Sequence, residues 1–432
     1  MSNSIYSLGA VIKVSSTSTP TFKQAIFNKR MLTCIFTGFS SGLPLFFLYQ
    51  LVPGWLRSEG VSLAEIGLFS LIGIPYVWKF IWSPVMDRYS LPFLGRRRGW
   101  MLLTQISLLV LIIAFGYVNP VMNIWAVAIL ATAVAFFSAS QDIVLDAYRR
   151  EILPDHELGL GNSIHVQAYR LAGLVPGSLG FILADHIAWP LVFLVVGLFM
   201  LAGIVMTICV SEAKTQVKAP QTIQDAVVLP FKDFINRNGM QSALLTLAFL
   251  FLYKLGDNMA TALQTPFFID LGFSNTEIGV VAKTASMIAM TIGLAIGGIV
   301  MIKLSINRAL WLFGFVQIAS ILGFAALAEI GHNNFALAFA MGFEYLGVGL
   351  GTAALTAFIA KSTNPAFAAT QFALFTALTA LPRTFANAST GFIVEQTGWT
   401  NFYLLCTLLA IPGMLMLFKV APWNDKTQAS DS

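Results

Sequence analysis

Eight charged side chains lie inside long apolar stretches of the sequence, where a charge is rarely found. The basic ones are Lys79, Arg170, Lys254, Lys283 and Arg383, and the acidic ones are Asp142, Asp257 and Glu344. An arginine at the centre of a membrane helix costs roughly 2.5–3.5 kcal/mol on insertion scales, so such charges indicate a functional site. Because the cations outnumber the acids by two, we expect a cavity that attracts an anionic solute.

The five cations differ in how they could hold an anion. An arginine binds a carboxylate through two parallel hydrogen bonds, whereas a lysine acts as a point charge. Arg170 lies near the middle of its apolar stretch and is therefore the predicted main substrate anchor, followed by Lys254 and Lys283. The alternative is that each cation pairs with an acid of the protein and joins two helices.

Uncharged polar side chains occur at the same depth. They are Tyr49, Gln50, Gln141, Gln167, Tyr169, Gln264, Gln371 and Asn387. Amides and hydroxyls of this kind could bind the hydroxyls and amides of a sugar. Their more common use within a membrane is a hydrogen bond between helices, and that alternative also stands.

The acids are candidates for proton coupling. Asp142 and Asp146 are four residues apart and share one helix face. A carboxyl group that takes up a proton on one side and releases it on the other would couple the proton to transport, and Asp142 is the predicted carrier. For Asp146 the alternative is a charge cluster with the arginines of the loop that follows the second span. Asp257 could instead neutralise Lys254, and Glu344 could be a protonated residue at a close helix contact.

The elements that position these residues are predicted to be membrane helices. The chain of 432 residues is 57% hydrophobic and only 10% charged, against about 25% charged residues in a typical soluble domain. Apolar runs of about 20 residues are long enough to cross a bilayer. We expect twelve spans, at residues 31–55, 64–86, 98–118, 122–148, 159–183, 188–210, 240–269, 276–300, 307–330, 333–360, 366–392 and 400–420.

The basic residues predict the orientation of these spans. Five of the 25 lysines and arginines lie inside spans, Arg57 lies in a loop on one side, and the other nineteen lie on the opposite side. Loops rich in lysine and arginine stay in the cytoplasm, so both termini are predicted to be cytoplasmic. The N-terminal segment lacks the pattern of a cleaved signal peptide, so the first helix is expected to remain as an anchor.

Two similar halves organise the chain. Ser62-x-x-Glu65-Ile66-Gly67 begins the second span, and Thr276-Glu277-Ile278-Gly279 begins the eighth. We expect an N-terminal tail at 1–30, a six-helix bundle at 31–210, a linker at 211–239, a second six-helix bundle at 240–420 and a C-terminal tail at 421–432. The linker contains AVVLPFKDFINR, which is either an amphipathic segment on the membrane surface or part of a flexible connection.

Other classes of function find little support in the sequence. Cys34, Cys209 and Cys406 lack the spacing of a metal site or disulfide framework, and the four histidines are scattered. We therefore expect no metal, no other cofactor and no enzymatic activity. The net charge of +5 arises from residues that set topology, so we expect no nucleic-acid partner.

The loop after the second span resembles the pattern G-x-x-x-D-R-x-G-R-R/K of the major facilitator superfamily. The matching residues are Asp87, Arg88, Gly95, Arg96 and Arg97, which the resemblance assigns to a gating loop. Ser83 replaces the leading glycine, and YSLPFL adds six residues. The fold implied is an all-α polytopic membrane protein with twelve helices in two pseudo-symmetric bundles, the layout of transporters that rock around a central site.

Longer strings are similar to the AmpG-type muropeptide permeases within that superfamily. They are FTGFSSGLPL, YVWKFIWSPVMDRYSLPFLGRRRGW, SASQDIVLDAY, YKLGD, GVVAKT and ATQFALFTALTALPR, which lie in both halves. The related acetyl-CoA transporter branch shares parts of this pattern. Some AmpG-type permeases carry further C-terminal spans, and this chain stops shortly after the twelfth.

The resemblance implies a monomeric, proton-coupled importer in the bacterial inner membrane. Its implied substrate is an N-acetylglucosaminyl-1,6-anhydro-N-acetylmuramyl peptide, whose stem peptide carries carboxylates, and its implied other partners are protons and the lipid bilayer. The alternatives are a transporter of another bulky anion, such as an acyl-CoA or a phosphorylated sugar, and a membrane receptor that transports nothing.

Overall fold

A computed structural model describes residues 28–91, 94–154, 157–212, 232–237, 239–363, 375, 378–379 and 381–424. Every regular element within these residues is a helix. Ten helices are long and apolar enough to cross a membrane. The predicted class, a polytopic helical membrane protein, is therefore confirmed.

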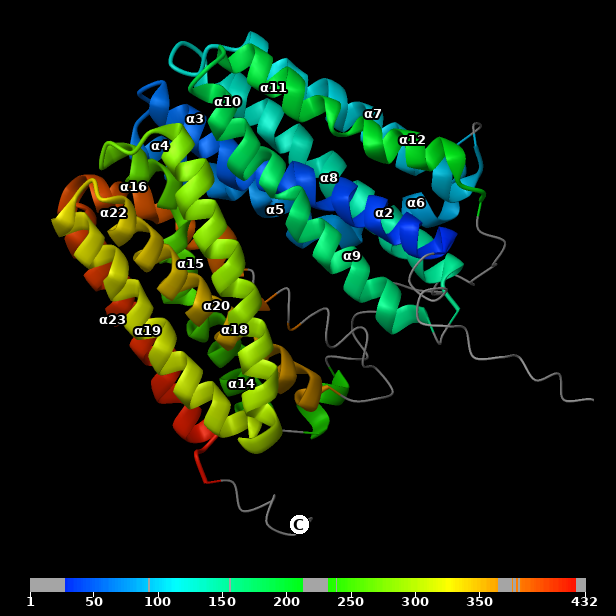
Figure 1. The fold of residues 1–432 in the computed structure, drawn as a ribbon. Helices are drawn as coiled ribbons and strands as arrows, with labels where there is room; N and C mark the ends of the chain where they lie inside the picture. The colour runs from blue at the N-terminus through cyan, green and yellow to red at the C-terminus, as the bar shows by residue number, and fades with distance from the viewer. Residues whose placement is uncertain are drawn as a thin grey trace, which may run out of the picture.

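The helices form two groups, which we call the first and second halves (Figure 1). The first half contains α2 (Lys29–Phe46), α3 (Val52–Ser58), α4 (Leu63–Leu68), α5 (Ile74–Trp78), α6 (Ser83–Arg88), α7 (Arg96–Ala114), α8 (Ile124–Ile152), α9 (Leu158–Ala172), α10 (Gly180–Ala184), α11 (Trp189–Leu198) and α12 (Leu201–Cys209). The second half contains α14 (Met240–Tyr253), α15 (Leu255–Ala262), α16 (Gln264–Asp270), α17 (Asn275–Glu277), α18 (Lys283–Lys303), α19 (Ile306–Ile330), α20 (Asn334–Ser362), α22 (Thr390–Thr397) and α23 (Trp399–Val420).

The two halves meet at one end and diverge toward the other (Figure 1). At the meeting end α3 packs against α16, α4 against α22, and α10 against α17. We call this the contact end. The start of α2 and the end of α23 both lie away from it, at what we call the terminal end. The structure therefore has a V shape with its two arms joined at the contact end.

The second predicted span, 64–86, is present as a series of short helical segments rather than one regular α-helix. The segment consists of α4, α5 and α6 separated by the 3₁₀ turns Phe69–Gly73 and Lys79–Ile81. Pro75 lacks a backbone N–H, and 3₁₀ turns in the middle of a helix are a common result of such strain. The eleventh predicted span, 366–392, lies largely outside the described residues, so the count of twelve stays a prediction.

The repeat between the halves is visible in the way the corresponding segments begin. The Ser62 hydroxyl accepts a hydrogen bond from the Glu65 N–H, and the Glu65 carboxylate accepts one from the Ser62 N–H. Ser274 and Glu277 form the same reciprocal pair in the second half. Such a capping box satisfies two backbone donors at the start of a helix. The repeated sequence thus forms the same local structure twice.

The arginines that begin α7 lie at the terminal end and are bound by two acids. Glu151 binds Arg96 at 3.1 Å and Arg97 at 2.8 Å, and the Glu151 side chain is only 3% exposed. Glu212 accepts hydrogen bonds from the backbone N–H groups of Arg97 and Arg98. The side chains of Asp87 and Arg88, also assigned to the gating loop, lie outside the described part of the structure.

Asp146 pairs with none of the described arginines of this cluster, although the sequence left such a pairing open. Its carboxylate is 55% exposed and pairs with Arg149 at 2.9 Å. Glu151 is five residues further along α8, which turns it by about 140° relative to Asp146. The helix rotation therefore decides which acid faces the arginines.

Replacing Glu151 with alanine is expected to lower the stability of the protein by about 3–5 kcal/mol. The change removes the buried carboxylate that the Arg96 and Arg97 side chains share, and removing one partner of a buried ion pair has a cost of this size. Thermal unfolding in detergent measures the effect. Glu157→Ala is the matched control, because Glu157 pairs with Arg30, whose side chain is 47% exposed. Equal shifts for both variants would contradict the prediction.

Part of the predicted membrane-surface segment is visible as the helical turn 232–237. Phe234 is buried and its ring lies 4.8 Å from that of Phe375. Arg237 donates a hydrogen bond to the Ser362 carbonyl oxygen at 2.8 Å. This turn is therefore docked on the second half.

Candidate functional site

A cavity of about 550 Å³ lies between the two halves. Polar side chains of both halves line it: Tyr49, Gln50, Ser70, Gln167, Tyr169 and Arg170 from the first, and Asp257, Asn258, Thr261, Gln264, Lys283, Ser286, Tyr345, Arg383 and Asn387 from the second. Apolar residues such as Phe46 and Phe181 complete the wall. The volume lies within the range of about 300–1,000 Å³ typical of small-molecule sites.

Arg170 reaches this cavity from the last turn of α9. Close packing of α9 on α2 sets its position: a Cβ atom on Gly42 would lie 2.3 Å from the Tyr169 carbonyl oxygen, so only glycine fits. The Arg170 side chain makes no hydrogen bond or ion pair with any described residue, and it lines the cavity. Its guanidinium is therefore available to a ligand.

Two further cations face the cavity from the second half. The Arg383 guanidinium lies over the Tyr49 ring, 3.9 Å from its centroid. The Lys283 Nζ donates a hydrogen bond to the Gln50 Oε1 at 2.8 Å and lies 5.2 Å from the centre of the Phe46 ring. Neither forms an ion pair with an acid among the described residues. Within the described part of the chain, the cavity thus has three cations without acidic partners.

The acid in the cavity wall is already paired. Lys254 and Asp257 form an ion pair at 3.0 Å, and both residues are only 8% exposed. Asp257 lines the cavity, whereas Lys254 lies behind it. The pair is electrically neutral, so it leaves the positive charge of the cavity unchanged.

Asp257 also has a second acidic neighbour. The Glu344 side chain is buried and accepts a hydrogen bond from the Ser320 hydroxyl at 2.7 Å. The other oxygen, Glu344 Oε1, has no donor in the described structure, and neither has Asp257 Oδ1. The two carboxyl groups are near enough for the charge of each to act on the other. Two buried negative charges repel one another, so this arrangement favours a proton on one of the two groups.

Asp142 and Lys79 lie in the first half, outside the wall of the cavity. Asp142 is half-buried on α8 and accepts a hydrogen bond from the Ser41 hydroxyl at 2.6 Å. Lys79 is close enough for its charge to act on Asp142, although the two form no ion pair in the described structure. Lys79 is the first residue of the 3₁₀ turn Lys79–Ile81, which interrupts the second span.

The structure brings together only part of the predicted substrate-binding set. Gln50, Arg170, Gln264, Lys283 and Arg383 line the cavity. Lys79, Gln141 and Lys254 do not; the Gln141 amide instead donates a hydrogen bond to the Ser40 carbonyl oxygen at 2.7 Å, inside the first half. Gln371 lies outside the described residues.

Sequence reasoning missed several residues of the wall. Asn258 follows Asp257 directly, and Tyr345 follows Glu344. The Tyr345 hydroxyl donates a hydrogen bond to the Gln264 Oε1 at 3.2 Å, which holds Gln264 in the wall. The signal available in the sequence was their position next to an acid within a membrane helix.

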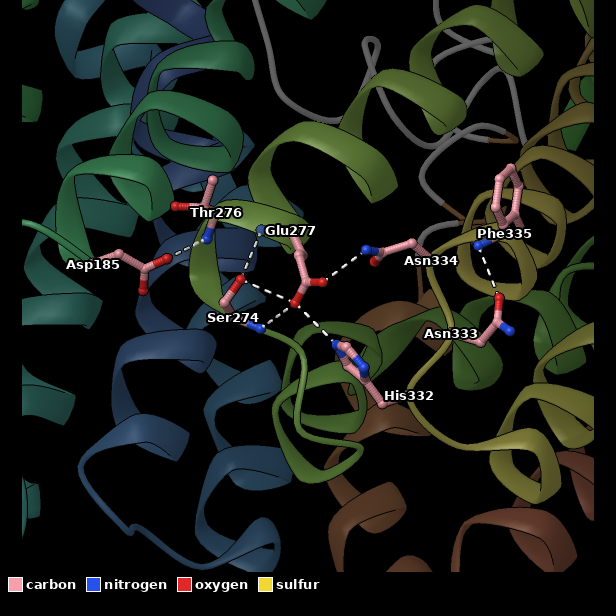
Figure 2. A network of polar contacts seen from close by, with 8 residues as sticks. All are labelled: Asp185, Ser274, Thr276, Glu277, His332, Asn333, Asn334 and Phe335. Atoms are coloured by element: carbon pink, nitrogen blue, oxygen red, sulfur yellow. Dashed lines mark hydrogen bonds and ion pairs between the residues drawn. The ribbon is translucent and has the colours of Figure 1, made fainter.

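Polar contacts join the halves at the contact end. Asp185 accepts a hydrogen bond from the Thr276 N–H at 2.6 Å (Figure 2). It accepts another from the Asn275 side chain at 2.9 Å. Burial raises the pKa of Asp185, but these hydrogen bonds outweigh it and lower the pKa below its ordinary value. Arg57 pairs with Asp270 across the same boundary.

A second polar cluster stabilises the neighbouring loops within the second half. The Glu277 carboxylate contacts the His332 ring at 3.0 Å and accepts a hydrogen bond from the Asn334 side chain at 2.7 Å (Figure 2). Glu277 is the capping-box acid of α17. The start of α17 therefore connects Asp185 of the first half with the loop between α19 and α20.

Comparison with known proteins places the sequence among transporters. Residues 34–386 match the model of the Major Facilitator Superfamily. The anhydromuropeptide permease of Escherichia coli (strain K12) is 41% identical over 405 residues, which cover 93% of this chain and 82% of that protein. An uncharacterized protein of Haemophilus influenzae is 48% identical over 417 residues, which cover 94% of this chain and 98% of that protein.

Solved structures share the fold at low sequence identity. A nucleoside transporter, NupG, superposes with a TM-score of 0.71 at 14% identity. The superposition covers 91% of this chain and the whole NupG chain. A D-xylose–proton symporter superposes with a TM-score of 0.69 at 13% identity, covering 91% of this chain and 97% of its own. These likenesses show the arrangement of the helices.

Proposed function

Since the chain belongs to the major facilitator superfamily, in the group that contains the E. coli anhydromuropeptide permease, we propose that it imports anhydro-muropeptides. The substrate is an N-acetylglucosaminyl-1,6-anhydro-N-acetylmuramyl peptide, moved across the bacterial inner membrane for recycling of the cell wall. The identity to the permease extends over both halves of the chain, which supports a shared substrate class.

The observation that carries this proposal is the set of three cavity cations without acidic partners. Arg170 from the first half and Lys283 and Arg383 from the second could each meet a carboxylate of the stem peptide. Amide and hydroxyl side chains between them, such as Gln167 and Asn258, suit the sugar hydroxyls and acetamido groups. Both halves contribute to the cavity of a single chain, which supports a monomeric transporter.

The orientation follows from the placement of the basic residues. The terminal end carries Arg96, Arg97 and most other loop cations, so we assign it to the cytoplasm and the contact end to the periplasm. The halves meet at the contact end, so the conformation corresponds to an inward-facing state. Alternating access requires that the contacts of Asp185 and Arg57 break when the cavity opens to the periplasm.

We assign the driving force to a proton gradient, with one proton-binding carboxyl site in each half. Asp142 is the site of the first half, and the pair of Asp257 and Glu344 is the site of the second. Each site is buried or half-buried and has a hydroxyl partner, Ser41 or Ser320. An ionisable group kept at this depth is commonly part of a proton pathway.

Asp142→Asn is expected to abolish accumulation driven by a pH gradient while sparing substrate exchange. Asparagine keeps an oxygen for the Ser41 hydroxyl but cannot take up or release a proton. Both activities are measured with labelled anhydro-muropeptide in proteoliposomes. Asp146→Asn is the control, because Asp146 is exposed and paired with Arg149. Normal accumulation by Asp142→Asn would remove Asp142 from the coupling mechanism.

The proposed function as a whole is tested by uptake of labelled anhydro-muropeptide into proteoliposomes, with and without an imposed pH gradient. We expect concentrative uptake only with the gradient. No uptake of the purified substrate would refute the substrate assignment, and accumulation indifferent to the gradient would refute proton coupling. Uptake of acetyl-CoA or a phosphorylated sugar in place of the muropeptide would favour the alternative substrates.

A further inference from the structure

The contact between Lys283 and Gln50 joins the two halves at the cavity wall. Lys283 begins α18 of the second half, and Gln50 follows α2 of the first; their Nζ and Oε1 atoms are 2.8 Å apart. The Lys283 ammonium therefore already donates a hydrogen bond to a protein oxygen in this conformation. That oxygen belongs to a neutral amide, whereas a carboxylate oxygen carries a negative charge that attracts the ammonium more strongly.

Three π-helical segments meet at this contact. They are Phe47–Leu51, which contains Gln50, Val175–Leu179, and Ile278–Ala282, which ends directly before Lys283. The middle segment packs against each of the other two. π-helices account for well under 1% of residues in proteins and occur frequently at functional sites. Their meeting point marks this contact as a specialised part of the fold.

Gly177 of the middle segment provides the space for the contact. A Cβ atom at this position would lie 2.1 Å from the Gln50 Oε1 and 3.0 Å from the Lys283 Nζ. Any side chain here would push the two groups apart. The backbone is thus shaped around the hydrogen bond between Gln50 and Lys283.

We infer that Gln50 displaces the substrate carboxylate from Lys283 when the transporter faces the cytoplasm, and so promotes release of the substrate. The inference rests on the proposed function. Gln50 and Lys283 belong to opposite halves, so they separate when the contact end opens, and Lys283 is then available to a carboxylate entering from the periplasm. When the contact end closes, the Gln50 oxygen returns and competes with that carboxylate.

Gln50→Leu tests this inference, because it removes the competing oxygen. A hydrogen bond to a charged group contributes about 1.5–3 kcal/mol, so we expect the inward-facing protein to bind anhydro-muropeptide roughly 12- to 150-fold more tightly. Turnover should fall because release is slower. If Gln50 is instead a direct substrate ligand, binding becomes weaker. Weaker or unchanged binding by Gln50→Leu would overturn the inference.

Gly177→Ala provides an independent variant with the same expected sign, because its methyl group would displace Gln50 from Lys283. Gly180→Ala is the matched control: it lies nearby in the same span, and its Cβ would approach only Leu51 side-chain atoms, at 3.0 Å, and the Val175 carbonyl oxygen, at 3.4 Å. Calorimetry on the purified protein gives the dissociation constants. Tighter binding in Gly180→Ala as well would mean that the effect does not come from the contact of Gln50 with Lys283.

A readout without substrate separates failure of this inference from failure of the proposed function. Spin labels on Glu59→Cys and Gln396→Cys, in a Cys209→Ser background, report the distance between the halves at the contact end; both positions are exposed, as is Cys209. Gln50→Leu should increase the population with a separated contact end. An unchanged distance distribution would show that Gln50 and Lys283 do not hold the halves together, whatever the substrate is.

Discussion

Uptake of labelled anhydro-muropeptide is expected to fall roughly 100-fold or more when Arg170 is replaced by glutamine. A hydrogen bond to a charged group contributes about 1.5–3 kcal/mol, and an arginine can form two such bonds with one carboxylate. Each 1.4 kcal/mol corresponds to a factor of ten in affinity. Initial uptake rates in proteoliposomes, at substrate concentrations below saturation, measure the loss.

The controls for Arg170 separate substrate binding from folding. Arg170 has no hydrogen-bond or ion-pair partner among the described residues, so its loss should leave the thermal stability nearly unchanged. Arg170→Lys keeps the charge but loses the planar pair of donors, and intermediate uptake is expected. Arg308→Gln, at an exposed position of the terminal end, should transport normally. Normal uptake by Arg170→Gln would move the main anchor to Lys283 or Arg383.

Glu344→Gln is expected to abolish gradient-driven accumulation while leaving exchange of labelled for unlabelled substrate intact. A glutamine has the shape of a protonated glutamate, accepts the Ser320 hydrogen bond, and donates to Asp257. It cannot release a proton. The variant therefore mimics one state of the carboxyl pair and prevents the cycle between the two states. Accumulation and exchange are measured in the same proteoliposome preparation.

The same substitution discriminates between coupling and packing. If Glu344 only fills space as a permanently protonated acid, glutamine replaces it without effect, and accumulation stays normal. Glu329→Gln is the matched control, because Glu329 is exposed at the contact end and accepts a hydrogen bond from the Thr400 hydroxyl. Loss of exchange along with accumulation would indicate a damaged fold and would call for Glu344→Asp, which keeps the acid.

Of the two acids Asp257 and Glu344, it is Asp257 that faces the cavity proposed to bind the substrate. Glu344 is 1% exposed, whereas Asp257 lines the cavity and also holds Lys254. A proton bound by Asp257 and Glu344 reduces the negative charge next to Lys254. Protonation therefore changes the net charge of the cavity wall. In the proposed mechanism, the proton site of the second half would lie directly behind the proposed substrate site.

The sequence by itself determined the class of the protein, the repeat and the identity of the membrane charges. These features are local: the transfer free energy of an apolar stretch, the capping box at Ser62 and Ser274, and the presence of Arg170 or Glu344 within a span do not depend on distant residues. The family resemblance also depends on strings of adjacent residues. Breaks in helices were partly readable, since Pro44 and Pro176 lie in or next to π-helical segments.

Only the tertiary structure decided which charges face the cavity and which are neutralised. Arg170 and Lys254 look alike in the sequence, yet one lines the cavity without a partner and the other pairs with Asp257 behind it. Partners such as Gln50 and Lys283 are 233 residues apart, so helix rotation and the packing of the two halves determine their contact. Periodicity along the chain carries no information about that rotation, because each helix is placed by the side chains of its neighbours.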